Sequence, residues 1–459
     1  MRLNQVFARF VDLSPVSVMV RGAIENVLAP DRLDKIFTDT ALRQYTRDLA
    51  FSSVVALMSE VVMRSRPSLH AAIRAYESEL PVKTKCIYNK VDGVEPQVSA
   101  ALVRQTAAHM AEVIQAMGGQ RPAPLPGFRV KILDGNHLAA TEKRLRALRN
   151  LPGAALPGRT VAVLDPALML AIDAFPIEDG HASERSVLPQ VLQTVQPGDV
   201  WIGDRNFCTR DFAVGIDARA GFFLIRQHAQ NLPLELVGER TFVGSTETGN
   251  VYEQTALAQR DDGSLMTLRR ITLELFQATR DGERALHLLT NIPSERADAL
   301  TLASLYRTRW TIENAFYELT VELSCEINTL GYPKAALFAF CVASMVYNIY
   351  SMVQAALRAQ HGAQQIDEQF SSYYLADEVG GAWRGMLIAI PESDWAEAFA
   401  SLTPAQLASA LCELAAQVSL RRFRKSKRGP KRPKPKIPKT SAHVSTAKLL
   451  AGRPSRKKC

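Results

Sequence analysis

Between residues 128 and 228 the chain alternates short apolar runs with polar turns, and several runs lead into an acidic residue. FRVKILDG contains Asp134, RTVAVLDP contains Asp165, ALMLAIDAFPI contains Asp173 and VWIGDRNF contains Asp204. With the intervening helical stretch SERSVLPQVLQTV, the pattern predicts the order strand, strand, strand, helix, strand, helix, strand. Such runs are typical of a buried sheet with functional residues at its strand ends. The segment is therefore α/β, and the pattern alone does not choose among the four aspartates.

The segments on either side have other periodicities. Residues 1 to about 125 carry apolar residues at helical spacing, as in AFSSVVALMSEVVM and QVSAALVRQTAAHMAEVIQAM, and the turn-rich GGQRPAPLPG follows them. Residues 229–285 resemble a series of β hairpins separated by turns. After HLLTNI the pattern becomes helical again. We therefore expect a helical N-terminal domain, an α/β domain interrupted by a β-rich insertion, and a helical C-terminal region.

Positive charge is concentrated in the last 39 residues. The chain has 55 Lys and Arg and 46 Asp and Glu, and 16 of the basic residues lie in 421–459, where there is no acidic residue. The preceding 420 residues are therefore net acidic. A segregated basic segment suggests a polyanionic partner, and its low apolar content favours nucleic acid over a membrane. Its Pro- and Lys-rich composition predicts disorder.

Two further features bear on compartment and solubility. The six cysteines are scattered and show no zinc-ligand spacing, so we expect reduced, unpaired thiols in a cytoplasmic protein. The 23 residues from Ala335 to Leu357 contain no charge and are long enough to cross a bilayer. They include Ser344, Asn348 and Gln354, and we interpret them as a buried helix of a protein without a membrane segment.

Three acids could form one site. If the first and fourth strands are neighbours, Asp134 and Asp204 converge at the centre of the sheet, and a helix packed across that edge could bring Glu313 to them. Three convergent carboxylates suit Mg²⁺ or Mn²⁺. Two such ions, about 3.5–4 Å apart, would activate a water or a 3′-hydroxyl and stabilise the leaving oxygen in phosphodiester chemistry. Each aspartate alone has a simpler explanation, because strand-end aspartates often cap the following loop.

The helix around Glu313 adds two residues suited to phosphate. Tyr306, Arg309 and Glu313 are spaced three and four apart, so they share one helix face. Arginine offers a bidentate fork and tyrosine a hydroxyl donor for phosphate oxygens. The alternative is a solvated polar face in which Glu313 only pairs with Arg309.

These motifs resemble the DDE transposases of insertion-sequence family four. Tyr306, Arg309 and Glu313 match the signature Y-x2-R-x3-E-x6-K of that family, whereas its final lysine is replaced by Thr320. LDGNHLAATEKR, LPGRTVAVLDP and GDRNF are similar to the regions of the first and second acids, in the same order. The resemblance covers roughly 130–345.

The resemblance implies a ribonuclease H-like catalytic domain that holds two Mg²⁺ ions, for which Mn²⁺ can substitute. It selects Asp134, Asp204 and Glu313 as catalytic, metal-binding residues in preference to the other aspartates. It implies DNA contacts by Tyr306 and Arg309, and we add Arg205, Asn206 and Thr320 as candidate DNA-binding residues. The missing lysine puts one phosphate contact in doubt, although the Thr320 hydroxyl could still donate a hydrogen bond.

The expected fold class is thus α/β, with a ribonuclease H-like mixed sheet, flanking helices, a β-rich insertion and a helical N-terminal domain. The predicted segments are a DNA-binding helical domain (1–125), the first part of the catalytic domain (126–228), the insertion (229–285), the second part with the Glu helix (286–358), a helical region (359–420) and a basic disordered tail (421–459).

The resemblance further implies cut-and-paste transposition. The expected partners are double-stranded DNA, as terminal inverted repeats and as target, and a second copy of the chain in the DNA complex. We expect a cytoplasmic protein of a bacterium, on the nucleoid when bound to DNA. Helices at 67–78 and 97–117, around a loop with Lys83, Lys85 and Lys90, could place a helix in a DNA groove. Two alternatives remain: a non-catalytic DNA-binding regulator derived from a transposase, and a nuclease of the same fold.

Overall fold

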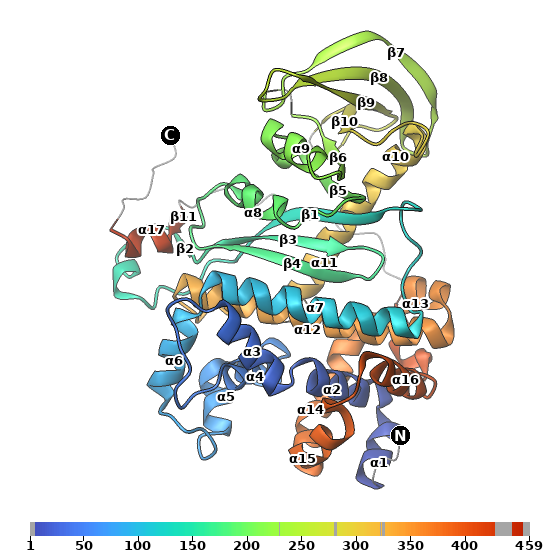
Figure 1. Cartoon of the computed structure of the whole chain (residues 1–459). Coiled ribbons are helices and arrows are strands. Elements are labelled where there is room, and N and C mark those ends of the chain that lie inside the picture. Colours follow the sequence, from blue (N-terminus) through green and yellow to red (C-terminus); the bar gives the residue numbers. More distant parts are fainter. Residues whose placement is uncertain are drawn as a thin grey trace.

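A nine-stranded mixed sheet forms the centre of the molecule, with helices on both faces (Figure 1). The computed structural model describes residues 5–228, 230–279, 282–321, 323, 326–426 and 443–452. The order across the sheet is β4-β3-β1-β5-β6-β10-β9-β8-β7. The strands are β1 (Arg129–His137), β3 (Arg159–Asp165), β4 (Leu170–Ile177), β5 (Asp199–Gly203), β6 (Phe222–Arg226), β7 (Glu235–Ser245), β8 (Gly249–Gln259), β9 (Leu265–Leu275) and β10 (Ala285–Thr290). This confirms the predicted mixed α/β class and the predicted order of elements.

Strands β1 and β5 are parallel neighbours at the middle of the sheet. Ile132 is opposite Ile202, and Leu133 is opposite Gly203. Both strands are buried along their apolar runs, which explains why those runs are continuous instead of alternating. The first residue after this pairing is an aspartate on each strand. The two apolar runs therefore place Asp134 and Asp204 at the same edge of the sheet, as predicted.

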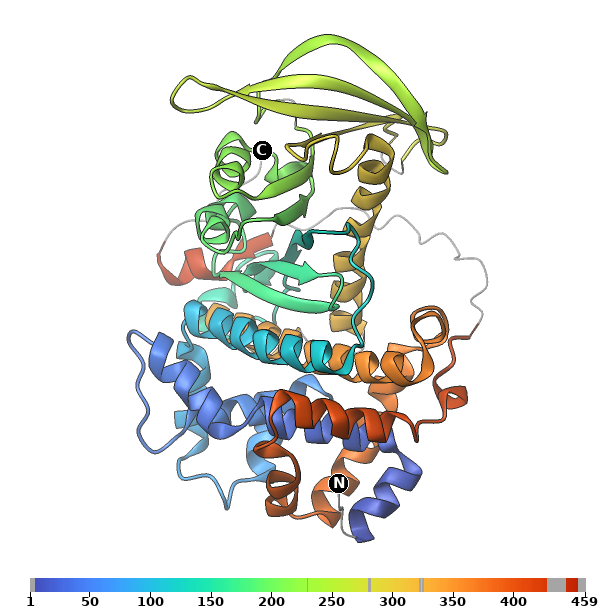
Figure 2. The ribbon, with the colours of Figure 1, turned by 45° about the vertical axis from the view of Figure 1, so that its right-hand side comes forward.

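The β-rich insertion extends the same sheet instead of forming a separate one. Strand β10 pairs with β6 on one side and with β9 on the other, so β9, β8 and β7 continue the sheet outward (Figure 2). Helix α10 (Ala299–Tyr306) packs against β7, β8 and β9. Helices α8 (Leu188–Leu192) and α9 (Arg210–Asp217) precede β5 and β6, respectively.

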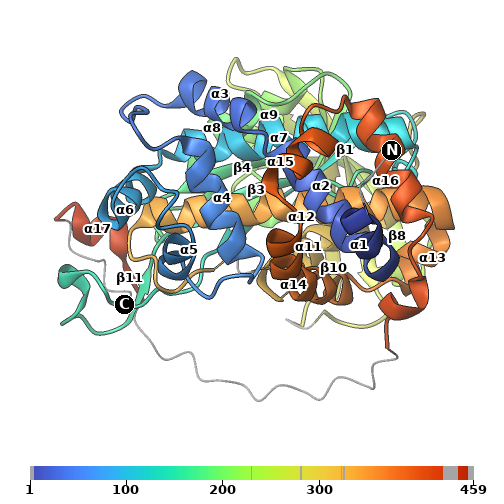
Figure 3. The ribbon, with the colours of Figure 1, turned by 90° about the horizontal axis from the view of Figure 1, so that it is seen from below.

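The helices of the first 125 residues share a core with the C-terminal helices, so they do not form the separate domain that we predicted. Large apolar side chains of both segments belong to one cluster, for example Phe51 with Phe338 and Phe7 with Trp395. Figure 1 shows both groups below the sheet, and Figure 3, seen from that side, shows them side by side in front of it. The N-terminal helices are α1 (Gln5–Leu13), α2 (Pro15–Val27), α3 (Pro30–Thr40), α4 (Phe51–Val62), α5 (Leu69–Ala75), α6 (Thr84–Gly93) and α7 (Pro96–Met117). The C-terminal ones are α12 (Pro333–His361), α13 (Ala363–Gln369), α14 (Ser372–Ala389), α15 (Glu392–Trp395), a π-helical turn η5 (Ala396–Ala400) and α16 (Pro404–Ala415).

Helix α7 lies between the sheet and the rest of the helical layer. Val103 of α7 meets Ala174 of β4 and Cys341 of α12 in one buried cluster. This packing buries part of α7, whereas other residues of the helix, such as Gln105 and Gln115, are exposed, so the groove-reading role considered for 97–117 stays a prediction. The segment expected to be a basic loop contains helix α6, on which Lys85 is exposed.

The long uncharged segment forms the buried helix α12, as predicted. Among the described residues it is the one helix long and apolar enough to cross a membrane, with a mean hydropathy of 1.7 over its most apolar window, and that window is completely buried in the protein. One of the polar residues of this helix, Asn348, has a structural role. Its side chain accepts from the backbone N–H of Ala171 and donates to the Ala171 carbonyl, beside an irregularity in the pairing of β3 and β4.

Part of the basic tail is folded, which corrects the prediction of disorder for 421–459. Strand β11 (His443–Ser445) pairs in parallel with β2 (Ala154–Leu156), and helix α17 (Thr446–Leu450) follows it. Lys448 and Ser445 both bind the Asp179 carboxylate, at 2.7 Å each. Residues 427–442 and 453–459 lie outside the described residues. Cys86, Cys208, Cys341 and Cys412 are unpaired, as expected, and the other two cysteines are also outside the described residues.

Candidate active site

The first two acids of the candidate site lie at the ends of the neighbouring strands β1 and β5. Asp134 is part of β1, and one of its oxygens accepts a hydrogen bond from the Gly135 N–H at 2.9 Å. Asp204 follows β5 directly and caps the short 3-10 helix η3 (Arg205–Phe207) by accepting from the Asn206 N–H at 2.8 Å. Asp204 therefore caps η3 through one carboxylate oxygen, and this hydrogen bond does not involve its second oxygen.

The third acid comes from a helical path that crosses this edge of the sheet. Asp298 caps the start of α10, the 3-10 turn η4 (Arg307–Arg309) tightens the helix, and α11 (Trp310–Val321) continues it past β1. Tyr306 ends α10 and Glu313 lies in the first turn of α11. The sequence predicted one helix here, and the structure divides it at η4.

Arg309 joins the strand end to the helix. One guanidinium nitrogen donates to the Asp134 carboxylate at 3.0 Å, and another donates to Glu313 at 2.6 Å. The Arg309 side chain is only 12% exposed. Asp134 and Glu313, which are 179 positions apart in the chain, are thereby joined through the guanidinium of Arg309, a contact to Asp134 that the sequence did not predict.

The electrostatics show that negative charge is in excess here. Burial raises the pKa of the Asp134 carboxyl to about 7; Arg309 opposes this rise, whereas Asp204 and Glu313 add to it. Burial also raises the pKa of Tyr306, opposed by Arg309 and reinforced by Asp204. Burial disfavours the charge on Arg309, but Tyr306, Asp134 and Glu313 raise its pKa overall. The three acids and Tyr306 therefore form one electrostatic unit.

The donor set has the chemistry that a hard divalent cation requires. Asp134 and Glu313 share one arginine and Asp204 lies near Asp134, which leaves net negative charge to be neutralised, and carboxylate oxygens are preferred ligands of Mg²⁺. In the described residues, however, no group of three or more His, Cys, Asp or Glu side chains is already close enough to hold an ion. Asp134 and Glu313 each use an oxygen on Arg309, so cation binding requires these side chains to rearrange.

The other two strand aspartates have partners of their own. Asp165 pairs with Arg129 at 3.0 Å and accepts from two backbone N–H groups of the turn that follows β3. Asp173 accepts two hydrogen bonds from Arg104 of α7, at 2.9 and 3.0 Å. Both lie away from the Arg309 cluster and complete local structure.

The residues predicted to contact DNA differ in how exposed they are. Arg205 is 57% exposed and lies 3.3 Å from Glu283. Asn206 instead uses its side-chain amide on Glu184, at 2.6 Å. Thr320 is exposed near the end of α11, where Arg64 donates to its carbonyl at 3.5 Å. Arg205 and Thr320 are thus accessible, whereas Asn206 supports the Asp204 turn.

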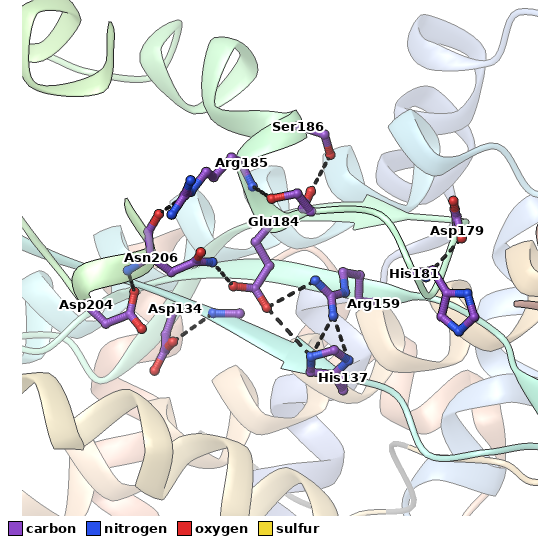
Figure 4. A network of polar contacts seen from close by, with 12 residues as sticks. Asp134, His137, Arg159, Asp179, His181, Glu184, Arg185, Ser186, Asp204 and Asn206 are labelled. Carbon is purple, nitrogen blue, oxygen red and sulfur yellow. Dashed lines mark hydrogen bonds and ion pairs between the residues drawn. The ribbon is translucent and has the colours of Figure 1, made fainter. Parts of the chain in front are cut away.

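Glu184 is a fourth acid that sequence reasoning missed. It begins the 3-10 helix η2 (Glu184–Val187) after β4, and Figure 4 shows its carboxylate between Asn206 on one side and Arg159 and His137 on the other. Its sequence context, SERSV, is polar and resembles an ordinary turn. No local signal distinguishes it, because its partners belong to three other segments.

Residues 127–349 match the family of transposase DDE domains. The matched segment contains all nine strands of the sheet, Tyr306, Arg309 and the three acids. The match supports a DDE transposase, and the mixed sheet with its flanking helices is the ribonuclease H-like α/β fold expected for one. No curated protein matches the chain.

Proposed function

We propose that this chain is a DNA transposase of insertion-sequence family four, which binds the terminal inverted repeats of its element and catalyses metal-dependent strand cleavage and strand transfer. The observation that carries this proposal is the meeting of Asp134 and Glu313 at Arg309, with Asp204 at the end of the neighbouring strand, within the segment that matches transposase DDE domains. Cut-and-paste transposition follows from the resemblance of the three motif regions to that family.

The three carboxylates are the proposed catalytic residues and metal ligands. Mg²⁺, as two ions or with Mn²⁺ as substitute, would lower the pKa of an attacking water or 3′-hydroxyl and stabilise the leaving oxygen. The chain itself supplies the geometry. The paired ends of β1 and β5 hold the two aspartates, and the helical path from α10 to α11 carries Glu313 across the same edge of the sheet.

Arg309 and Tyr306 are suited to hold the scissile phosphate. Arg309 has both guanidinium ends on carboxylates in the metal-free protein, and cations bound to those carboxylates would release it for a phosphate. The Tyr306 phenol stays protonated because its pKa is raised, so it remains a donor. Arg205, Asn206 and Thr320 complete the proposed DNA contacts, with Asn206 acting chiefly through the Asp204 turn.

The partners are part of the same proposal. Two copies of the chain would hold paired element ends, and DNA would meet the exposed surfaces of the helices of residues 1–125, such as that of α6. The basic residues after 420 would add contacts to phosphates that do not depend on sequence. We place the protein in the bacterial cytoplasm, on the nucleoid when bound to DNA.

One experiment separates this function from its two alternatives. The purified protein is incubated with Mg²⁺ or Mn²⁺, a DNA that carries the element ends and a supercoiled target. A transposase cleaves at the ends and joins the 3′-hydroxyls to the target. A nuclease cleaves without joining, and a regulator binds without cleaving. Asp134→Asn protein, which should bind and not cleave, is the control for contaminating nucleases.

A further inference from the structure

Glu184 lies outside the proposed catalytic triad, and its carboxylate is between Asn206 on one side and Arg159 and His137 on the other (Figure 4). Its side chain is 14% exposed. One oxygen accepts from the Asn206 side-chain amide at 2.6 Å, and the other lies 3.6 Å from a guanidinium nitrogen of Arg159 and 3.9 Å from a ring nitrogen of His137. The carboxylate therefore contacts residues of β1, β3 and the turn after β5.

On the β5 side, Glu184 acts on Asp204 through Asn206. The Asn206 N–H is the donor to Asp204, and its side-chain amide is bound by Glu184. The neighbouring Arg185 donates to the Asn206 carbonyl at 2.7 Å. Two consecutive residues of η2 thus hold one asparagine by its side chain and its backbone. This fixes the turn that orients the Asp204 carboxylate.

On the β1 side, Glu184 packs directly on the residue after Asp134. A Cβ placed on Gly135 would come within 2.3 Å of the Glu184 carboxyl carbon, a distance that real side chains do not reach. Glycine at this position therefore allows the carboxylate to lie against the β1 backbone. The same Gly135 N–H donates to Asp134, so this contact and the Asp134 orientation share one peptide.

We propose that Glu184 is a positioning residue that sets the separation and orientation of Asp134 and Asp204 for cation binding. This inference rests on the proposed function, because it concerns the same carboxylates. Residues that hold metal ligands in place typically change metal affinity or activity by about 10- to 100-fold when they are replaced. A turn residue with only a structural role would change the stability of the fold and leave the cation affinity unchanged.

The test compares Glu184→Ala, Glu184→Gln and Gly135→Ala with the wild-type protein. Glutamine retains a carbonyl oxygen that can accept from Asn206 but loses the charge that faces Arg159. Gly135→Ala displaces the Glu184 carboxylate while leaving Glu184 in place. Glu378→Gln is the matched control, since Glu378 is also a poorly exposed glutamate, 20% exposed, that pairs with an arginine, Arg422, in another part of the molecule.

Three quantities are measured: Mn²⁺ binding without DNA by electron paramagnetic resonance, the single-turnover cleavage rate at saturating end DNA, and the melting temperature. We expect Glu184→Ala to weaken Mn²⁺ binding and slow cleavage by about 10- to 100-fold with an unchanged Kd for DNA. Glu184→Gln should recover a large part of this loss, and Gly135→Ala should resemble Glu184→Ala. Glu378→Gln should alter only the melting temperature.

The inference is overturned if Glu184→Ala and Gly135→Ala bind Mn²⁺ with the wild-type affinity, whatever their melting temperatures. It is also overturned if the wild-type protein binds no Mn²⁺. A wild-type protein that binds Mn²⁺ but cleaves no DNA contradicts the proposed function alone, and the Mn²⁺ titration of the variants still decides the role of Glu184.

Discussion

The parallel pair of strands β1 and β5 has an acidic residue at both of its ends, and the two ends are built differently. At the beginning of the strands, Asp199 pairs with Lys131 at 2.6 Å, both side chains are at most 5% exposed, and the Gln196 N–H gives Asp199 a second donor. At the other end, Asp134 must share Arg309 with Glu313. An acid with its own buried cation completes the fold, whereas acids that share one cation leave negative charge that a ligand can neutralise.

The same distinction separates the candidate site from the remaining strand aspartates. Asp165 has Arg129 and Asp173 has Arg104, so each is paired one to one. Asp134, in contrast, shares its arginine with Glu313. Substitution of each kind of acid tests this distinction.

Replacement of one of the three acids of the candidate site should have the largest effect, which is on the rate of catalysis. Asp134→Asn, Asp204→Asn and Glu313→Gln should each lower the cleavage and joining rates by at least about 1,000-fold, because groups that act as one catalytic unit are lost together. Binding to end DNA should persist, since the acids repel phosphate in the metal-free state. Gel assays of cleavage and binding on the same preparations measure both.

A double variant such as Asp134→Asn with Glu313→Gln should be no slower than either single variant. The controls are Asp165→Asn and Asp173→Asn, which should keep cleavage wherever they fold. A Glu313→Gln protein that cleaves end DNA at a rate close to wild type would remove Glu313 from the site.

Replacement of the paired acid should instead act on stability. Asp199→Asn leaves Lys131 charged and without its buried partner, which typically costs about 3–5 kcal/mol of unfolding free energy. Urea denaturation measures this loss, and cleavage per folded molecule should remain near the wild-type value. The double variant Lys131→Met, Asp199→Leu should recover much of the stability, because it removes both charges. If Asp199→Asn were as stable as the wild type, the two ends of the strand pair would not differ in the way described above.

The sequence already contained most of what locates the site. The apolar runs predicted the strand order, the parallel pairing brought Asp134 and Asp204 to one edge, and helical spacing placed Tyr306, Arg309 and Glu313 together. These features could be predicted because each follows from the periodicity of a short segment, together with the assumption that the first and fourth strands are neighbours.

What could not be predicted depends on contacts between distant segments. An amphipathic pattern shows that a helix has a buried face but not what covers it, so the shared core of the N- and C-terminal helices was missed. Glu184 lies in a polar turn and gains its role only when β1, β3 and η3 surround it. Strand β11 has three residues, too few to give a periodic signal.

The raised pKa of Asp134 predicts that this acid destabilises the metal-free fold at neutral pH. A carboxyl titrates near 3.9 when unfolded and near 7 here, so the native state binds the extra proton between these limits. The contribution of Asp134 to stability should therefore be most favourable below pH 4, fall by at most about 1.4 kcal/mol per pH unit as the pH rises to 7, and then level off.

Urea denaturation with a chelator, from pH 5 to 8, tests this dependence. Asp134→Asn should lack the contribution of Asp134 to the pH dependence of stability, and it should be more stable than the wild type at pH 8. Asp199→Asn, in contrast, should be less stable than the wild type. Excess Mg²⁺ should flatten the wild-type slope by favouring the ionised carboxylate. A wild-type slope that persists unchanged in Asp134→Asn would assign it to another group.

The smallest expected effect concerns the position where the resemblance fails. Thr320 is two helical turns beyond Glu313 on nearly the same face of α11, it is exposed, and Arg64 contacts its carbonyl. Thr320→Lys should tighten binding to end DNA by about 1 kcal/mol or less, the scale of an exposed ion pair. It should also steepen the salt dependence by about one phosphate contact. Thr320→Gln, which adds length without charge, should leave the salt dependence unchanged. Weaker binding of Thr320→Lys at low salt would mean that repulsion from Arg64 outweighs any phosphate contact, and that Arg64 already supplies the positive charge on this face.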